Sequence, residues 1–449
     1  MDVTYWIKAL LRMFYIVTPS EYKTENGSSV FKEALPFFAL FMVLENVILY
    51  TKKGSFLRLN DSINSLSHGI FYECGRLLSR GLENWLYCYI YYNFKLVELQ
   101  WDTAATWYCV AVMVDFCYYW VHRASHEIHI LWAQHQVHHS SEDFNLGVGL
   151  RQSIFHAWCG FVLYLPMAFF VPPKQFIMHQ QFNLLYQFWI HTEIVSNLGV
   201  LEHVLNTPNH HRVHHGSNPI YLDKNYGGVL IIWDKLFGTF MPYVSEITYG
   251  LVYQPRTFNP LYQQFFYTGN VYQKFDSFQD WPNKLQSMIK GPSWTPGSEW
   301  TGDEKNKMDN TQRSKHNPQL RTWLKIYLCL HFILTVKLFD DSVAQSNLVH
   351  PIETFLLVCY ILFSLTVIGM FFDDNPSAIS WEILRCLTIY VYIRYSGNDI
   401  YFFNFDTEIV YILSACFWIV YVFNKSSGNS CYQYDTIGKK YLSARSLVK

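Results

Sequence analysis

The sequence is poor in charged residues and lacks paired cysteines. Charged residues make up 15% of the chain, whereas a soluble domain carries roughly 25%. The formal net charge of −1 excludes a strongly basic surface, so nucleic acid is not expected as a partner. The 10 cysteines form no CxxC pair, which excludes a dense disulfide framework and a thiolate metal site. What remains is 51% hydrophobic and 18% aromatic, which is typical of a membrane protein.

Apolar runs predict an all-α, polytopic integral membrane protein. A helix needs about 20 mostly apolar residues to cross a bilayer. The candidate spans are 34–50, a weaker 85–94, 106–121, a helical hairpin of 155–171 and 176–194, and 323–339, 352–372, 381–393 and 409–423. Residues 1–18 are instead expected to form an amphipathic segment at the membrane surface.

These runs predict five parts of the chain. They are an N-terminal interfacial segment with membrane spans (1–100), a catalytic domain (101–290), a polar linker (291–320), C-terminal spans (321–424) and a flexible tail (425–449). Residues after 197 in the catalytic domain contain no long apolar run and predict a soluble cap.

Nine of the 18 histidines fall into four short groups. His122 and His126 form the pattern HxxxH. The pattern HxxHH occurs twice, as His135, His138 and His139 and as His211, His214 and His215. His191 stands alone in FWIHTE. Positions i, i+3 and i+4 of a helix share a face, so each box points its imidazoles in one direction. Because the predicted hairpin crosses and returns, all four groups meet at one membrane face.

The number and type of these side chains predict a site for two metals. Imidazole suits iron, copper, zinc and nickel, whereas magnesium and calcium prefer oxygen ligands. Nine histidines exceed what one tetrahedral zinc uses, so two iron ions fit the count best. His211 is preferred to the adjacent His210 because it is in register with His214 and His215. Asp115, an acid in an apolar run two helical turns before His122, is expected to orient an imidazole.

The motifs resemble those of the membrane fatty acid hydroxylase and sterol desaturase superfamily. The resemblance rests on DFCYYWVHR from Asp115, HQVHHSSED from His135, NHHRVHHG from Asn209 and WDKLFGTF from Trp233. It is specific between residues 101 and 240 and looser in the C-terminal spans. The chain departs from the family at His203 and at residues 147–149, which leaves substrate preference open.

Within the superfamily the motifs are similar to those of the branch that cleaves ether lipids. The resemblance implies two iron ions and tetrahydrobiopterin as cofactors, an alkylglycerol as substrate, dioxygen, membrane lipid, and an external reductase that recycles the pterin. The resemblance implies that the histidines of the HxxxH and HxxHH boxes bind the metals and that Glu127 takes part in pterin use. Asp115, Glu127 and Asp223 are expected to be catalytic residues. The implied location is the endoplasmic reticulum membrane, and Arg123 and Arg151 place the catalytic side in the cytosol.

Two other functions remain open on the residues alone. A lipid or sterol hydroxylase or desaturase that draws electrons from cytochrome b5 uses the same boxes. The chain carries no Gly-rich dinucleotide fingerprint, so in either case its reductant comes from outside. A zinc carrier would place its ligands at mid-membrane depth, whereas these boxes lie at span ends and in the cap.

Overall fold

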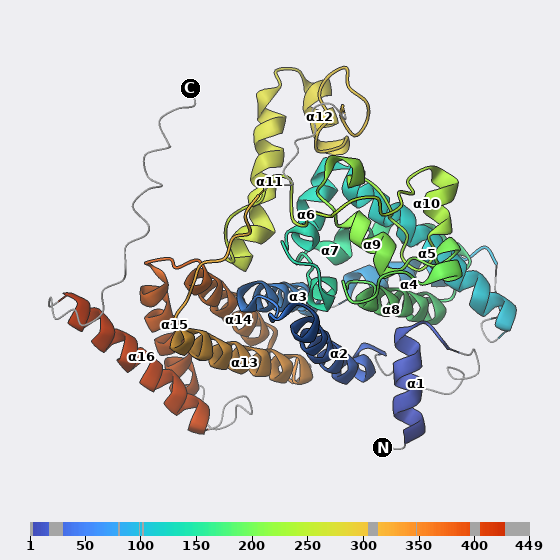
Figure 1. The fold of residues 1–449 in the computed structure, drawn as a ribbon. Helices are drawn as coiled ribbons and strands as arrows, with labels where there is room; N and C mark the ends of the chain where they lie inside the picture. Colours follow the sequence, from blue (N-terminus) through green and yellow to red (C-terminus); the bar gives the residue numbers. More distant parts are fainter. Residues whose placement is uncertain are drawn as a thin grey trace. The chain divides into compact units, whose positions relative to one another are not determined.

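The protein is helical throughout the parts that its computed structural model describes (Figure 1). These parts are residues 3–17, 30–79, 81–97, 99–100, 103–303, 313–346, 348–395 and 405–426. Their strand-type pairing is limited to two isolated bridges, Leu205 with Leu230 and Gly216 with Tyr249. The predicted all-α class is therefore confirmed. The chain divides into two compact units, Met1–Asp374 and Asn375–Lys449.

Five helices are long and apolar enough to cross a membrane, counted over the described ranges. The first unit contains four of them: α2 (Val30–Lys53), α5 (Ala104–Glu127), α13 (Thr322–Ala344) and α14 (Pro351–Phe372). The second unit contains α15 (Ala378–Tyr395) and α16 (Phe405–Ser426), of which α16 carries the fifth candidate span. All five coincide with predicted apolar runs, so a multi-pass membrane protein is confirmed.

The predicted hairpin forms, but its arms are not two spanning helices. The first arm breaks into α7 (His156–Cys159) and the 3-10 helix η3 (Phe161–Phe169), and the second is the 17-residue α8 (Pro173–Trp189). Gly160 lies at the break and passes close to α5, where a Cβ would lie 2.1 Å from Val121 Cγ1. The weaker predicted span at 85–94 is also wrong: α4 (Leu82–Phe94) has 13 residues, about 20 Å of helix. The predicted span at 381–393 falls in α15, which is not among the five candidates.

The long helix α3 (Leu59–Ser79) was not predicted from the sequence. It packs against α13, α14 and the 3-10 helix η2 (Leu146–Leu150). Its buried face is polar and includes Asn60, Asp61, Asn64, Ser65 and His68. Such a face gives no apolar run, so composition alone did not reveal it.

The first unit contains further, mostly shorter helices. They are α1 (Val3–Met13), α6 (His129–His139), α9 (Pro208–His214), α10 (Ile232–Phe237), α11 (Pro260–Ser277), α12 (Trp281–Ile289), η4 (Gly199–His203) and η5 (Pro219–Tyr221). α6 packs on α5 and on α11, which places the second histidine box beside the first. Most of the predicted tail, from residue 427 on, and residues 304–312 of the predicted linker lie outside the described residues.

Candidate metal centre

All nine predicted histidines come together in two buried groups. One group contains five: His122, His126, His135, His139 and His214. The other contains four: His138, His191, His211 and His215. Within each group the nearest imidazole nitrogens all lie within 4.8 Å of one another. The centre lies where α5, α6 and α9 meet (Figure 1).

The two HxxHH boxes divide their histidines between the groups in opposite ways. α6 gives its i, i+4 pair, His135 and His139, to the five-histidine group and His138 to the other. α9 and the C-cap residue that follows it contribute in the opposite way. His211 and His215 belong to the four-histidine group, and His214 belongs to the five-histidine group. This is the consequence of helical periodicity, because i and i+4 point one way and i+3 is rotated from them.

Backbone carbonyl groups orient four of the imidazoles. His122 Nδ1 donates to Tyr226 O at 2.8 Å, and His214 Nδ1 donates to Lys224 O at 2.9 Å. In the four-histidine group, His138 Nδ1 donates to Arg151 O at 3.0 Å and His191 Nδ1 to Gln187 O at 2.6 Å. A carbonyl oxygen only accepts hydrogen bonds, so each of these Nδ1 atoms carries a proton.

The resulting arrangement of lone pairs fits metal ions. With Nδ1 protonated, the neutral rings of His138 and His191 direct bare Nε2 atoms at each other across 3.2 Å. Two lone pairs repel at that distance unless a cation lies between them. His126, His139 and His214 also have buried Nε2 atoms with no hydrogen-bond partner among the described residues. These orphaned acceptors are what a metal bound to histidine requires.

Burial keeps these imidazoles neutral at neutral pH. It lowers the pKa of His191 to about 3. It lowers the pKa of His138, His139, His211 and His215 well below the ordinary range, and neighbouring imidazoles lower the pKa further. The neutral ring is the form that binds a metal, so the centre is prepared for metal without releasing protons.

Two buried aspartates hold the loop that orients His122. Asp234 accepts hydrogen bonds from the backbone nitrogens of Tyr226 and Gly227 at 2.7 and 2.8 Å. Asp115 accepts from the backbone nitrogens of Val229 and Leu230, from Trp233 Nε1 and from Asn183 Nδ2. The hydrogen bonds of Asp115 go to this loop, Trp233 and Asn183 rather than to an imidazole, so any effect of Asp115 on His122 is indirect. Asp115 fixes the loop, and the loop's carbonyl orients the ring.

Two further buried charges support the four-histidine group, and sequence reasoning missed both roles. Arg151 donates to Val137 O and Ser140 Oγ at the end of α6, while its own carbonyl accepts from His138. Glu45 of α2 accepts from Thr192 Oγ1 at 2.5 Å and from Leu146 N at 2.9 Å. An acid inside an apolar span was the available signal for Glu45.

The other two predicted catalytic acids lie outside the histidine groups. Glu127 pairs with Arg123 Nε at 2.9 Å, one turn earlier on α5, and its carbonyl accepts from Trp300 Nε1. Asp223 and Asn225 have φ angles of 60° and 56°, in the left-handed region that Asp and Asn tolerate best. The residue between them, Lys224, supplies the carbonyl that His214 uses. His210, excluded on register, stays outside both groups with Glu202 3.9 Å away.

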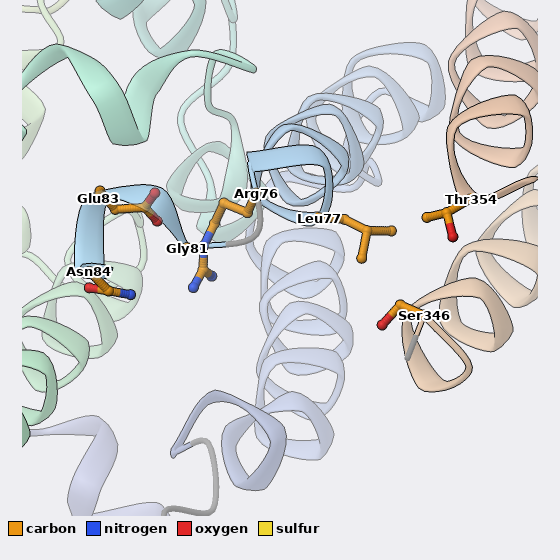
Figure 2. A pocket seen from close by; sticks show the side chains of 7 residues that line it. All are labelled: Arg76, Leu77, Gly81, Glu83, Asn84, Ser346 and Thr354. Carbon is orange, nitrogen blue, oxygen red and sulfur yellow. The ribbon is translucent and has the colours of Figure 1, made fainter. Parts of the chain in front are cut away.

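A cavity of about 310 Å³ lies away from the histidines. Figure 2 shows side chains at its edge, among them Arg76 from the end of α3, Glu83 and Asn84 from the start of α4, and Thr354 from α14. No predicted site residue lines it.

Comparison with known proteins identifies the class of protein to which this centre belongs. The fatty acid hydroxylase family model matches residues 107–239, the segment that carries all nine histidines. The fold and the site thus define a membrane protein of the fatty acid hydroxylase type. A second model, the alkylglycerol monooxygenase C-terminal domain, matches residues 324–408. No solved structure matches the chain.

Relatives that match most of the chain identify its family within this class. The alkylglycerol monooxygenase of Xenopus tropicalis is 40% identical over 413 residues, which cover 90% of this chain and 92% of that protein. The human enzyme of that name is 40% identical over 90% of this chain and 93% of its own length. The Caenorhabditis elegans enzyme is 33% identical over 85% and 81%. The chain belongs to the alkylglycerol monooxygenase family.

Proposed function

We propose that this chain is a di-iron, tetrahydrobiopterin-dependent monooxygenase that cleaves the O-alkyl ether bond of alkylglycerols. The nine histidines would hold two iron ions, five at one position and four at the other. The observation that carries the proposal is the pairing of bare Nε2 atoms in a buried site where each Nδ1 of His122, His138, His191 and His214 is committed to a carbonyl. The family membership supports the substrate class.

The reaction follows from the chemistry of an ether. An alkyl ether has no good leaving group, so a positioned base would cleave it very slowly, and oxidation is the alternative. One atom of dioxygen enters the C–H bond beside the ether oxygen, and the other leaves as water with two electrons from the reduced pterin. The hemiacetal that results separates into a fatty aldehyde and glycerol. Bound iron would supply the activation of dioxygen.

The chain's own residues then have two tasks. The carbonyl-anchored imidazoles fix the metal positions, and Asp115, Asp234, Arg151 and Glu45 keep the anchoring loops in place. Glu127, on the outer turn of α5 beside Arg123, is the proposed contact for the pterin. We further propose the endoplasmic reticulum membrane as the location, a cytosolic catalytic side, and an external reductase that returns the pterin to its reduced form.

The test is aldehyde release from an alkylglycerol by membranes that contain the chain. Tetrahydrobiopterin, or cytochrome b5 with its reductase, is added in parallel samples, and membranes carrying His211→Ala provide the control. Aldehyde that depends on the pterin and on His211 is the expected result. Turnover supported by cytochrome b5 alone would instead assign the chain to the cytochrome-linked lipid hydroxylases.

A further inference from the structure

The hydroxyl of Tyr226 is buried and has no hydrogen-bond partner among the described residues. Three other buried tyrosines of the first unit pair theirs. The hydroxyls of Tyr87, Tyr186 and Tyr221 donate to the carbonyls of Val171, Asn206 and Ser245 at 3.0, 2.8 and 2.8 Å. A buried hydroxyl that lacks an acceptor costs free energy. The exception at Tyr226 therefore indicates an acceptor that the polypeptide does not supply.

Its position shows which site that acceptor belongs to. The Tyr226 ring centroid lies 5.2 Å from His126, 5.8 Å from His122 and 6.0 Å from His214. All three histidines belong to the five-histidine group. Tyr226 is fixed there at its backbone, since its nitrogen donates to Asp234 and its carbonyl accepts from His122. The Tyr226 ring is therefore held against the five-histidine group.

The histidines themselves are not the missing acceptor. The Tyr226 hydroxyl and the Nε2 atoms of His126 and His214 are all without a hydrogen-bond partner among the described residues, so neither ring accepts from the hydroxyl at Nε2. The Nδ1 atoms of His122 and His214 are protonated and donate to carbonyls. We propose that the Tyr226 hydroxyl donates a hydrogen bond to a small exogenous ligand, a water-sized molecule or anion. This ligand would complete the coordination of the metal held by the five-histidine group, so the inference rests on the two-metal site of the proposed function. A phenol is a donor at neutral pH, and the ring lies beside three imidazoles of the five-histidine group.

The test uses azide as the exogenous ligand. Iron-loaded protein purified in detergent is titrated with azide, and the azide-dependent absorption gives Kd for the wild type and for Tyr226→Phe. The variant should retain its iron and bind azide about three- to tenfold more weakly, the range expected for one lost hydrogen bond. Tyr226 replaced by 3-fluorotyrosine retains the hydroxyl and should keep the wild-type Kd.

Tyr119→Phe is the matched control. Its hydroxyl is already paired with Thr239 at 3.0 Å and with Arg123 at 3.2 Å, so its loss should leave the azide Kd unchanged. Three results would overturn the proposal: an unchanged azide Kd in Tyr226→Phe, loss of iron from that variant, or a higher KM for tetrahydrobiopterin without weaker azide binding. The azide difference does not depend on the substrate, so its persistence in a protein that releases no aldehyde would reject the proposed function and keep this inference.

Discussion

The carbonyl oxygen of Arg151 accepts a hydrogen bond from His138 Nδ1 at 3.0 Å, while the guanidinium of the same residue ties the end of the helix that carries His138. Arg151 is completely buried, and its guanidinium also contacts Ser65 and Gln263. One residue therefore fixes both the orientation of the ring and the position of its backbone.

Arg151→Lys should weaken the four-histidine group. A lysine keeps the charge but not the fork that reaches several acceptors at once, so we expect a loss of about 10- to 100-fold in metal affinity or activity. Iron per chain and aldehyde release are the measurements. Arg76→Lys, on the far end of α3 and partly exposed, should change neither.

His211→Ala and His210→Ala form a pair of adjacent substitutions with opposite expected results. His211 belongs to the four-histidine group, whereas the nearest charged group to His210 is Glu202. The first variant should lose iron and turnover. The second should retain its iron, and iron loss of equal size in both would contradict the assignment.

Glu45→Gln should destabilise the loops on both sides of the four-histidine group. The carboxylate accepts at both oxygens, from Thr192 and from Leu146, and an amide presents a donor to one of them. We expect a loss of about 1–3 kcal/mol in stability, measured by thermal unfolding in detergent. Glu193→Gln, which breaks an exposed pair with Lys53, should cost under about 1 kcal/mol.

Gly228→Ala should damage the loop that Asp115 anchors. A Cβ at Gly228 would lie 2.7 Å from Tyr118, 2.8 Å from Asn183 and 2.9 Å from Asp115. Overpacking of this kind costs about 1–3 kcal/mol. Gly269→Ala is the control, because its Cβ meets nothing within 4 Å and alanine favours the helix. Unfolding measurements should show Gly228→Ala to be destabilised and Gly269→Ala to be stabilised.

His129→Asn should reduce the acid sensitivity of the metal-depleted protein. Burial lowers the pKa of His129 to about 4, whereas the unfolded chain binds this proton near about pH 6.5. Between these values the unfolded state carries the extra proton, so stability falls as pH falls, by up to about 1.4 kcal/mol per pH unit. The fall in Tm from pH 6.5 to pH 4.5 should be smaller in the variant; equal falls would mean that the folded ring already accepts the proton.

The histidine boxes could be predicted from sequence because their geometry is local. Residues at i, i+3 and i+4 lie on neighbouring parts of the helix surface wherever the helix lies, so the nine residues were identified and the structure brings them together. Their division between two groups was not predicted, because i+3 is rotated from i and i+4. The partners of their Nδ1 atoms were not predictable. They are backbone carbonyls of Gln187, Lys224 and others, and a carbonyl has no signature in sequence.

The fold was predictable where apolarity alone decides it. The helix α14 is a nearly continuous apolar run, and its bounds matched the predicted span closely. The polar buried face of α3 depends on partners far along the chain, at Ser141, Phe258 and Gln263. The close approach of Gly160 to Val121 is likewise a tertiary contact. Asp115 shows the same limit, because its partners lie more than 100 residues away at Val229 and Leu230.

The crossed allocation of histidines from α6 and α9 would make the two proposed metal positions interdependent. Each helix contributes to both groups, so filling one position fixes rings that border the other and removes part of their freedom before the second ion arrives. The second ion then binds to a partly ordered site. At limiting iron, the population should consist of empty and doubly loaded molecules, with few that carry a single ion.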